Sequence, residues 1–427
     1  MSLELQENKR FWFPLDNAAK IFPSVLSEEI PVVFRISAVL KEPVKINELQ
    51  KALLLTEKRF PYYKVSLKKG FFWFYMEYLP KPIPIEVDSR VCRKFSENKI
   101  LVRVLVKGKS ISVEFSHILT DGGGAMEFFK TLIIEYSKML GAEVPENFEY
   151  IKPDSEISEE EYEDAYNAYF KEEIPPILKR SKAFHLPFAL NQKPRFRHMS
   201  AMISIEQIKA VAKQKNVNIT IYLVAIYIYV LQEIFEELPF TSKFKRNKVI
   251  RLQVPVNLRG ILPSKTMRNF SLFVMPEIDM RLGHYTFEEI LKTVYHQISL
   301  ETDAKLLNKN INRNVRSEKK FYIRAIPLFI KNAVLRMKYY SLGTKQYSGV
   351  ISNIGLVKLP KDTSDLIDYF YVVNPPPNKM LKINCGIISF EDKLVMTFGS
   401  VVKSKEFEEK FRQFLEKEGV DMTIINS

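Results

Sequence analysis

A histidine and an aspartate stand four residues apart, directly before three glycines, in the stretch EFSHILTDGGGAMEFFKTL at residues 114–132. The imidazole of His117 titrates near neutral pH and can act as a general base on a substrate hydroxyl or amine. Asp121 opens a turn whose glycines allow positive φ angles and a close approach to the backbone. Because the chain has only 14 Gly in 427 residues, three in succession indicate a specific demand on this turn.

A less specific interpretation of the same residues stays open. Alternation along the preceding segment places Ile111, Val113 and Phe115 on one face with His117. A histidine at the end of such a face is more often a buried, hydrogen-bonded residue than a catalyst, and Asp121 can serve only as a helix cap. The combined HxxxDG spacing favours the catalytic interpretation.

Other chemistries find no support in the sequence. The GKS at 108–110 has Arg103 where a phosphate-binding loop needs glycine, and GGGAME has Glu127 where GxGxxG needs it. The chain contains no GxSxG, so a serine nucleophile elbow is excluded. Cys92 and Cys385 are isolated, and no further ligands cluster near His117, so we expect no metal site.

Strands and helices must alternate to position these residues. A β-hairpin is predicted over 97–119 and a helix over 126–140, which makes the histidine region a strand, a glycine turn and a helix. The second half predicts a strand and helix over 200–220, a buried helix over 221–235, a central strand ending in a turn over 249–260, helices over 285–307 and 321–340, a strand and turn over 346–355, a hairpin over 382–402 and a helix over 404–419.

The length of 427 residues suits two domains of roughly 200 residues each. A Pro-interrupted segment that changes from acidic to basic separates the two halves. We therefore predict an N-terminal lobe over 1–175, a linker over 176–198 and a C-terminal lobe over 199–427. Both halves mix strands with helices, so the fold class is α/β or α+β.

The net charge of +14 is unevenly distributed. Residues 308–349 carry ten Lys or Arg against one acid, Glu318, which implies an anionic partner or a solvated surface. No signal peptide and no apolar run of about 20 residues is evident, so a cytoplasmic protein without a transmembrane segment is expected.

The basic region includes a predicted helix with an apolar stripe. Its members are Ile326, Ile330, Ala333, Val334 and Met337. The stripe predicts a helix packed on the C-terminal lobe, with the cations Lys331, Arg336 and Lys338 in solvent, where they gather an anionic donor. A helix lying on a membrane surface is the alternative.

The stretch SHILTDGGG resembles the HxxxDG motif of the CoA-dependent acyltransferase superfamily, which includes chloramphenicol acetyltransferase, peptide-synthetase condensation domains, BAHD acyltransferases and alcohol acetyltransferases. WFPLDNAAKIFP, VPVNLRG with MRNF, and SNIGLVKLP resemble further segments of the alcohol-acetyltransferase-like branch, in the same order along the chain. Ser116 stands where many relatives have a first histidine, and the DFGWG of BAHD enzymes is absent, with VISNIG near its place.

The resemblance implies two chloramphenicol-acetyltransferase-like lobes, each a mixed sheet with flanking helices, and an active-site tunnel between them. His117 would be the general base for direct attack of an acceptor on a thioester. Asp121 would pair with Arg259 and hold the turn, and both are counted with His117 in the catalytic set. The expected substrate-binding or donor-binding residues are Gly122, Gly123, Asn257, Ser352 and Asn353, although the SNIG segment can equally be a simple turn.

The implied function is transfer of an acyl group from acyl-CoA, as co-substrate, to the hydroxyl of a small-molecule or lipid alcohol. No tightly bound cofactor, no nucleic acid and a monomer are expected. One alternative is a condensation-like enzyme that acylates an amine or uses an acyl carrier protein. A second is a non-catalytic binding module, against which the retained His117, Asp121 and Arg259 count.

Overall fold

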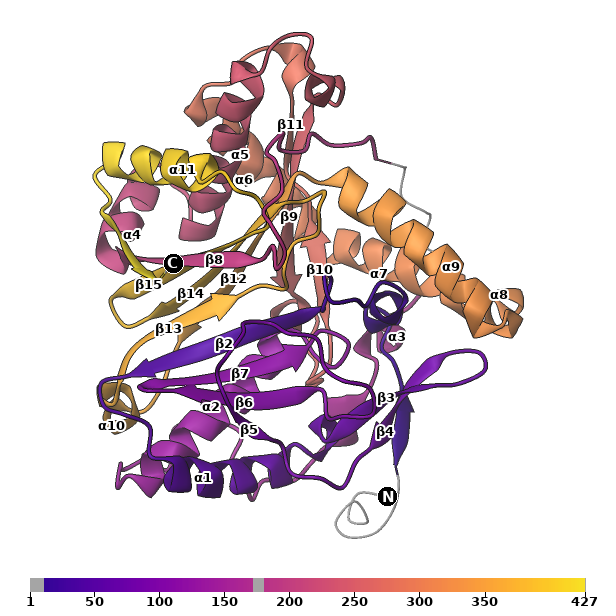
Figure 1. Ribbon diagram of the computed structural model, residues 1–427, viewed down its shortest axis with the longest axis vertical. Coiled ribbons are helices and arrows are strands. Elements are labelled where there is room, and N and C mark those ends of the chain that lie inside the picture. The colour runs from indigo at the N-terminus through magenta and orange to yellow at the C-terminus, as the bar shows by residue number, and fades with distance from the viewer. Residues whose placement is uncertain (1–10, 172–179, 427) are drawn as a thin grey trace.

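The computed structural model describes residues 11–171 and 180–426 and has the expected mixed α/β architecture (Figure 1). Its strands form three sheets. The N-terminal sheet has the order β13 (Ile367–Val373), β2 (Val33–Leu40), β7 (Ser110–Ser116), β6 (Val102–Lys107) and β5 (Ile85–Val87). The C-terminal sheet has the order β10 (Ser271–Val274), β9 (Val249–Asn257), β12 (Gly349–Val357), β14 (Ile383–Phe390), β15 (Lys393–Ser400), β8 (Arg197–Ser204) and β16 (Met422–Asn426), and β11 (Glu277–Asp279) also pairs with β9. A small sheet contains β1 (Trp12–Pro14), β4 (Phe74–Tyr78) and β3 (Val65–Lys69).

Helices flank both large sheets (Figure 1). The N-terminal sheet is covered by α1 (Ile46–Arg59) and α2 (Gly122–Met139), and the C-terminal sheet by α4 (Ile205–Gln214), α5 (Ile219–Glu237), α6 (Phe287–Glu301) and α11 (Glu406–Lys417). The remaining helices are α3 (Ala165–Ala168), α7 (Ala304–Lys319), α8 (Phe321–Ala325), α9 (Leu328–Lys338) and α10 (Lys361–Asp365).

One strand of the N-terminal sheet comes from the second half of the chain. Strand β13 lies in the second half of the sequence but pairs antiparallel with β2, with Phe370 opposite Ala38 and Val372 opposite Ile36. It then returns to the C-terminal sheet as β14. The predicted division at 176–198 stays a prediction, and residues 1–10 and 172–179, which include part of that linker, lie outside the described residues.

Several predicted elements are confirmed. The hairpin over 97–119 is β6 and β7, with Val102 opposite Phe115, and the hairpin over 382–402 is β14 and β15. Two predicted helices are wrong in extent. The helix over 285–307 ends at Glu301, because Asp303 caps a new helix, α7, that runs on to Lys319. The helix over 321–340 is divided into α8 and α9 at Pro327, since proline disfavours the helical conformation in the residue before it.

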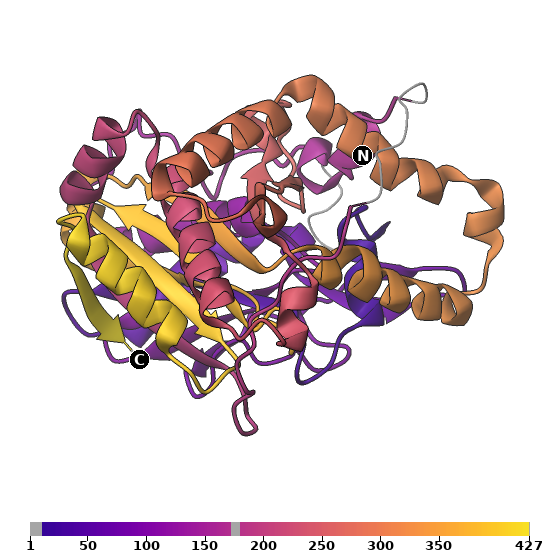
Figure 2. The ribbon, with the colours of Figure 1, turned by 90° about the horizontal axis from the view of Figure 1, so that it is seen from above.

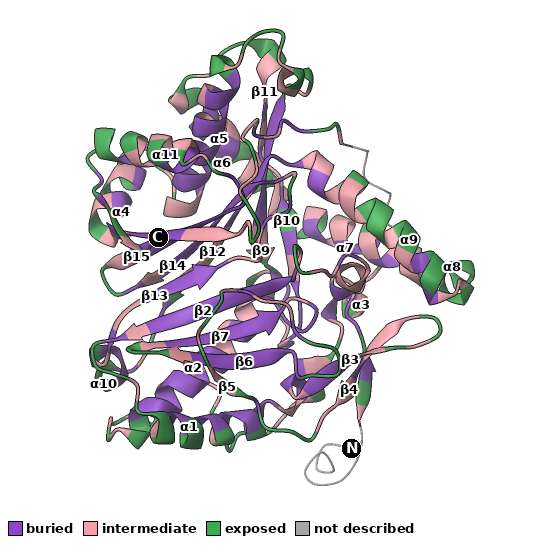
Figure 3. Cartoon of the chain, in the orientation of Figure 1, coloured by how far each residue is buried: buried purple, intermediate pink, exposed green. Residues whose placement is uncertain are grey.

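The apolar segment 221–235 lies in α5, as predicted, and fills the core of the C-terminal half (Figure 3). Among the described residues, α5 is the one helix long and apolar enough to cross a bilayer by length and composition. Most of its surface is buried between the sheet and α6 and α11, which is the arrangement of a core helix.

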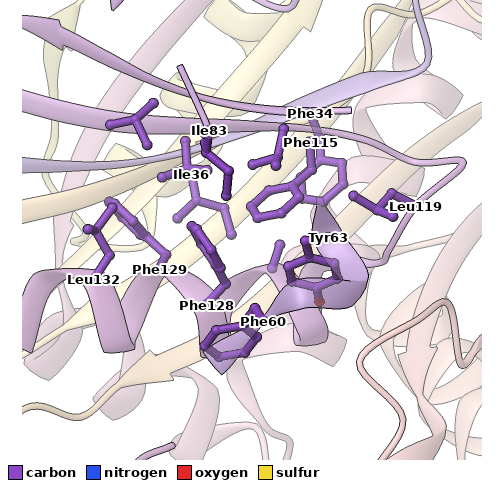
Figure 4. Close-up of a cluster of buried hydrophobic side chains, with 14 of the residues drawn as sticks. Phe34, Ile36, Phe60, Tyr63, Ile83, Phe115, Leu119, Phe128, Phe129 and Leu132 are labelled. Carbon is purple, nitrogen blue, oxygen red and sulfur yellow. The ribbon is translucent and has the colours of Figure 1, made fainter. Parts of the chain in front are cut away.

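Aromatic packing holds α2 against the N-terminal sheet at the end of β7, the strand that precedes the histidine. Phe115, two residues before His117, contacts Phe128 of α2 edge-to-face with ring centroids 5.5 Å apart. Tyr63 contacts the same Phe115 at 5.4 Å (Figure 4). Edge-to-face pairs add specific geometry to apolar burial. The strand before His117 and the helix after Asp121 therefore form one packed unit.

Candidate active site

His117 follows the last residue of β7, where the strand leaves the sheet. Its backbone N–H donates to the carbonyl of Val32, 2.8 Å away, so the backbone keeps the strand register. The imidazole lies between the rings of Phe22 and Phe34, with centroid distances of 5.5 and 5.0 Å. The residue as a whole is of intermediate burial.

Asn269 determines which nitrogen of His117 carries the proton. The Asn269 Nδ2 lies 3.1 Å from the carbonyl oxygen of His117, which can only accept a hydrogen bond. The amide oxygen must therefore face Nδ1 of His117, at 3.0 Å. An acceptor there requires Nδ1–H, so the lone pair is on Nε2. This tautomer leaves Nε2 as the proton-accepting atom.

Asp16 holds Asn269 in turn. Its Oδ2 accepts from Asn269 Nδ2 at 3.0 Å, and its Oδ1 accepts from the backbone N–H of Ala19 at 2.8 Å. The carboxyl is fully buried, and burial raises its pKa even though the Arg268 guanidinium, 3.7 Å away, opposes this. The sequence analysis missed Asp16 and Asn269 as site residues. Their signal was present, because both lie in segments that carry the resemblance, WFPLDNAAKIFP and MRNF.

The surroundings of His117 favour its neutral form. Burial lowers the pKa of the imidazole, and the hydrogen bond to Asn269 opposes that shift only in part. A pKa below the ordinary value for histidine leaves the base unprotonated at neutral pH. The imidazole is therefore ready to accept a proton.

Asp121 connects three parts of the chain through one carboxylate. Its Oδ1 accepts from Gly124 N at 3.1 Å and caps α2. Its Oδ2 accepts from Arg259 Nη1 at 3.0 Å and from Phe270 N at 2.7 Å. Burial acts to raise the pKa of Asp121, but the charge and hydrogen bonds of Arg259 outweigh it, so the pKa is lowered. The expected pairing of Asp121 with Arg259 is present.

Arg259 also organises the loop that carries Asn269. Its Nε donates to Thr266 O at 2.8 Å, and a further guanidinium nitrogen donates to Arg268 O. Asn257, an expected substrate-binding residue, accepts from the Arg259 backbone and side chain, both at 3.1 Å. Asn257 therefore positions Arg259 in this structure.

The three glycines lie in the first turn of α2 and do not form a separate turn before it. None has a positive φ, so close approach is their common requirement. A Cβ on Gly124 would lie 2.2 Å from the carbonyl oxygen of Met267, and one on Gly123 would lie 2.9 Å from Arg259 Nη1. These glycines let the loop 266–270 dock on the helix.

Gly122 faces the other half of the molecule. A Cβ there would lie 2.6 Å from Ile354 Cδ1 in the SNIG segment. This segment is part of strand β12 and contains a bulge between Asn353 and Leu356, so the expected turn is wrong. Asn353 stabilises the bulge by accepting from Gly355 N at 2.8 Å.

The structure brings most of the predicted site residues into one assembly. His117, Asp121, Arg259, Gly122, Gly123 and Asn257 meet at the start of α2. Among the described residues, no hydrogen bond joins Ser352 or Asn353 to His117. Within the same residues, no group of three His, Cys, Asp or Glu side chains is arranged to hold a metal ion.

A cavity of about 640 Å³ opens beside the N-terminus of α5. Lys209, Lys213 and Asn218 are among its lining residues, together with Thr220. The hydroxyl of Thr220 accepts from Asn353 Nδ2 at 2.9 Å, which connects this cavity to the SNIG segment. His117 does not line it, so a tunnel reaching His117 stays a prediction.

Replacing Asp121 with Asn separates its charge from its capping role. The amide oxygen can still accept from Gly124 N, but an NH2 group then replaces Oδ2, so the mostly buried Arg259 loses its counter-ion and Phe270 N loses its acceptor. Breaking a buried pair from one side costs about 3–5 kcal/mol, and we expect the lower end because Arg259 keeps three acceptors. Urea unfolding measures the change in stability. The control is Asp365→Asn, because Asp365 forms an exposed i,i+4 ion pair with Lys361. Equal stability of Asp121→Asn and wild type would refute the pairing.

Replacing Asn269 with Ala should release the Nδ1–H of His117. The pKa of His117 should fall further, since Asn269 acts to raise it. We expect a lower kcat, and the acid limb of kcat/KM against pH should move to lower pH. An unchanged pH profile at reduced stability would show that Asn269 only supports the fold.

No protein-family model and no curated protein matches the chain. Solved structures match it over nearly its whole length. A trichothecene 15-O-acetyltransferase from Fusarium sporotrichioides is 10% identical, with 97% of this chain and 96% of that chain covered at a TM-score of 0.60. TRI101 from F. sporotrichioides, crystallised with coenzyme A and T-2, is 11% identical, with 97% and 99% covered at 0.59.

The first condensation domain of the CDA synthetase is 13% identical, with 96% of each chain covered at a TM-score of 0.59. At this level of identity the similarity concerns the fold. The chain therefore has the two-lobed α/β fold that these acetyltransferases and condensation domains share, as the resemblance implied.

Proposed function

We propose that the protein is an acyltransferase that moves an acyl group from acyl-CoA to the hydroxyl of an alcohol. The observation that carries this proposal is the tautomer of His117: the Asn269 oxygen faces Nδ1–H, which leaves the lone pair on Nε2 as the proton acceptor. The shared fold of alcohol acetyltransferases supports the same reaction class. A fold alone does not determine chemistry, so the proposal depends on the site.

In the proposed reaction, Nε2 of His117 removes the proton of the acceptor hydroxyl as its oxygen attacks the thioester carbonyl. The tetrahedral intermediate collapses with cleavage of the carbon–sulfur bond. The imidazolium then returns its proton to the departing thiolate, so the products are an ester and free coenzyme A. No covalent acyl-enzyme is needed, which agrees with the absence of a GxSxG nucleophile.

The residues around His117 take positioning roles in this proposal. Asp121 and Arg259 hold the turn, and Asp16 holds Asn269. Ser352 is the proposed donor to the oxyanion. Asn353 is less suited to that role, because its side chain already bonds to Thr220 and Gly355.

We place the anionic end of the donor in the cavity at the N-terminus of α5. Helix N-termini attract phosphate through unpaired N–H groups and the helix dipole, and Lys209 and Lys213 add positive charge. A neighbour with the same fold was crystallised with coenzyme A, which supports a CoA donor. Hydrogen bonding between Thr220 and Asn353 connects this cavity to the segment facing Gly122.

His117→Ala tests the base directly. Removing a general base typically costs about 10²–10⁴-fold in rate, and we expect that loss with little change in melting temperature. Thiol release from a panel of acyl-CoAs, with alcohol and amine acceptors, measures it, and exposed His296→Ala is the control.

For wild type, kcat/KM should rise with pH through a midpoint below the ordinary histidine value, because the folded-state pKa is lowered, and then remain level. A folded His117→Ala protein with wild-type turnover would overturn the mechanism. Turnover with amines alone would favour the condensation-like alternative.

A double variant, Lys209→Ala with Lys213→Ala, tests where the donor binds. The KM for acyl-CoA should rise, whereas the KM for an acyl-pantetheine that lacks the nucleotide phosphates should change little. Added salt should reproduce part of the loss in wild type. Lys51→Ala with Lys58→Ala on α1 is the matched control. Equal effects on both donors would place the phosphates elsewhere.

A further inference from the structure

An arm formed by α8 and α9 extends away from both large sheets (Figure 1), and the view from above shows the same projection (Figure 2). The tip of the β3–β4 hairpin supports it. The backbone N–H of Leu328 donates to the carbonyl of Phe71 at 2.9 Å, and Lys331 Nζ donates to the carbonyls of Phe72 and Arg324 at 3.1 and 3.0 Å. These bonds join the hairpin tip, α8 and α9 into one unit.

The orientation of α9 is the opposite of the predicted one. Lys331 is buried, with its ammonium 4.0 Å from the centre of the Trp73 ring, so a cation lies on the inner face of the helix. The residues predicted to pack inward include Ile330, Val334 and Met337, which are 44%, 41% and 63% exposed. The helix contacts the hairpin tip and the 3₁₀ helix Ala19–Ser24 of the N-terminal half, so the expected contact with the C-terminal lobe is also wrong.

The arm and the hairpin tip bound to it therefore expose a group of apolar side chains, which we call the apolar tip. Phe321 is 82% exposed, Phe329 70% and Phe71 73%. Single hydrophobic residues scattered over a surface are normal and need no explanation. Several large exposed ones near each other mark an interaction site. The apolar tip consists of Phe71, Phe72, Phe321, Tyr322, Phe329, Ile330, Val334 and Met337.

Positive charge surrounds the apolar tip. From residue 319 to residue 361 the sequence contains no Asp or Glu. Arg324, Arg336 and Lys338 are exposed on the arm, and Lys319 and Lys320, directly before α8, are exposed too. Aromatic side chains beside exposed Lys and Arg are the composition of segments that lie in the interface of an anionic membrane.

We propose that the apolar tip docks the protein on an anionic lipid membrane. The aromatic and aliphatic side chains enter the boundary between headgroups and acyl chains, and the cations contact lipid phosphates. The projection of the arm lets its tip reach a flat surface while the sheets remain in water. The inference depends on exposure and charge alone and does not require the proposed acyl transfer.

Flotation with vesicles tests the proposal, using phosphatidylcholine alone and phosphatidylcholine mixed with phosphatidylserine. Wild type should bind the mixed vesicles, and added salt should weaken binding. Phe321→Ser with Phe329→Ser should reduce partitioning by roughly tenfold per phenylalanine. Arg324→Gln with Lys338→Gln should reduce it by roughly fivefold per cation.

Phe240→Ser is the matched control, since Phe240 is 90% exposed but lies outside the arm, and it should bind as wild type does. His117→Ala should also bind normally, so failure of the catalytic proposal leaves this result unaffected. Failure of wild type to bind mixed vesicles would overturn the proposal. Sedimentation velocity tests the other occupant, a second copy of the chain. If wild type self-associates, the Phe321 and Phe329 changes abolish this, and vesicles are not bound, the apolar tip is a contact between copies.

Discussion

The arrangement of the site depends on the hydrogen bonds and the ion pair that the Asp121 carboxylate makes. It caps α2 through Gly124, neutralises Arg259 and accepts from the backbone of Phe270. These three bonds dock the loop 266–270 on the start of the helix. Since Asn269 lies in that loop, the bonds of Asp121 also hold in place the side chain that faces Nδ1 of His117. In the proposed reaction the aspartate acts through geometry and charge, away from the proton transfer itself.

Close approach of backbones makes this arrangement possible. Without a side chain at Gly124, the helix start can meet the Met267 carbonyl at a distance that a Cβ would prevent, and a Cβ at Gly123 would displace the Arg259 guanidinium. The glycines after Asp121 could have been expected to make room for a substrate. Two of them, Gly123 and Gly124, instead make room for other parts of the protein. Of the three, Gly122 faces the C-terminal sheet, at Ile354 of β12.

The cations of the cavity and of the arm lie in two separate places, which the net charge alone does not distinguish. Lys209 and Lys213 line a cavity at a helix N-terminus, a geometry suited to a small phosphate-bearing molecule. The cations of the arm surround exposed aromatic rings, a geometry suited to an extended anionic surface. Lys331 belongs to neither group, because its ammonium is used in holding α9 against Trp73.

From the sequence alone, four strands and the residue types of the site could be predicted, whereas the extents of two helices and the turn at SNIG were predicted wrongly. Alternation predicted β6, β7, β14 and β15, and the HxxxDG spacing singled out His117 and Asp121, because these patterns depend on neighbours in the chain. Tertiary structure alone decided that Asn269 and Asp16 set the tautomer, since they lie 152 and 101 residues from His117. Tertiary structure also decided that β13 pairs with a strand of the N-terminal sheet and which face of α9 is buried. An apolar stripe defines a helix face, but whether that face is buried depends on which surface the rest of the chain presents to it, and here a buried lysine over Trp73 turned the stripe toward solvent.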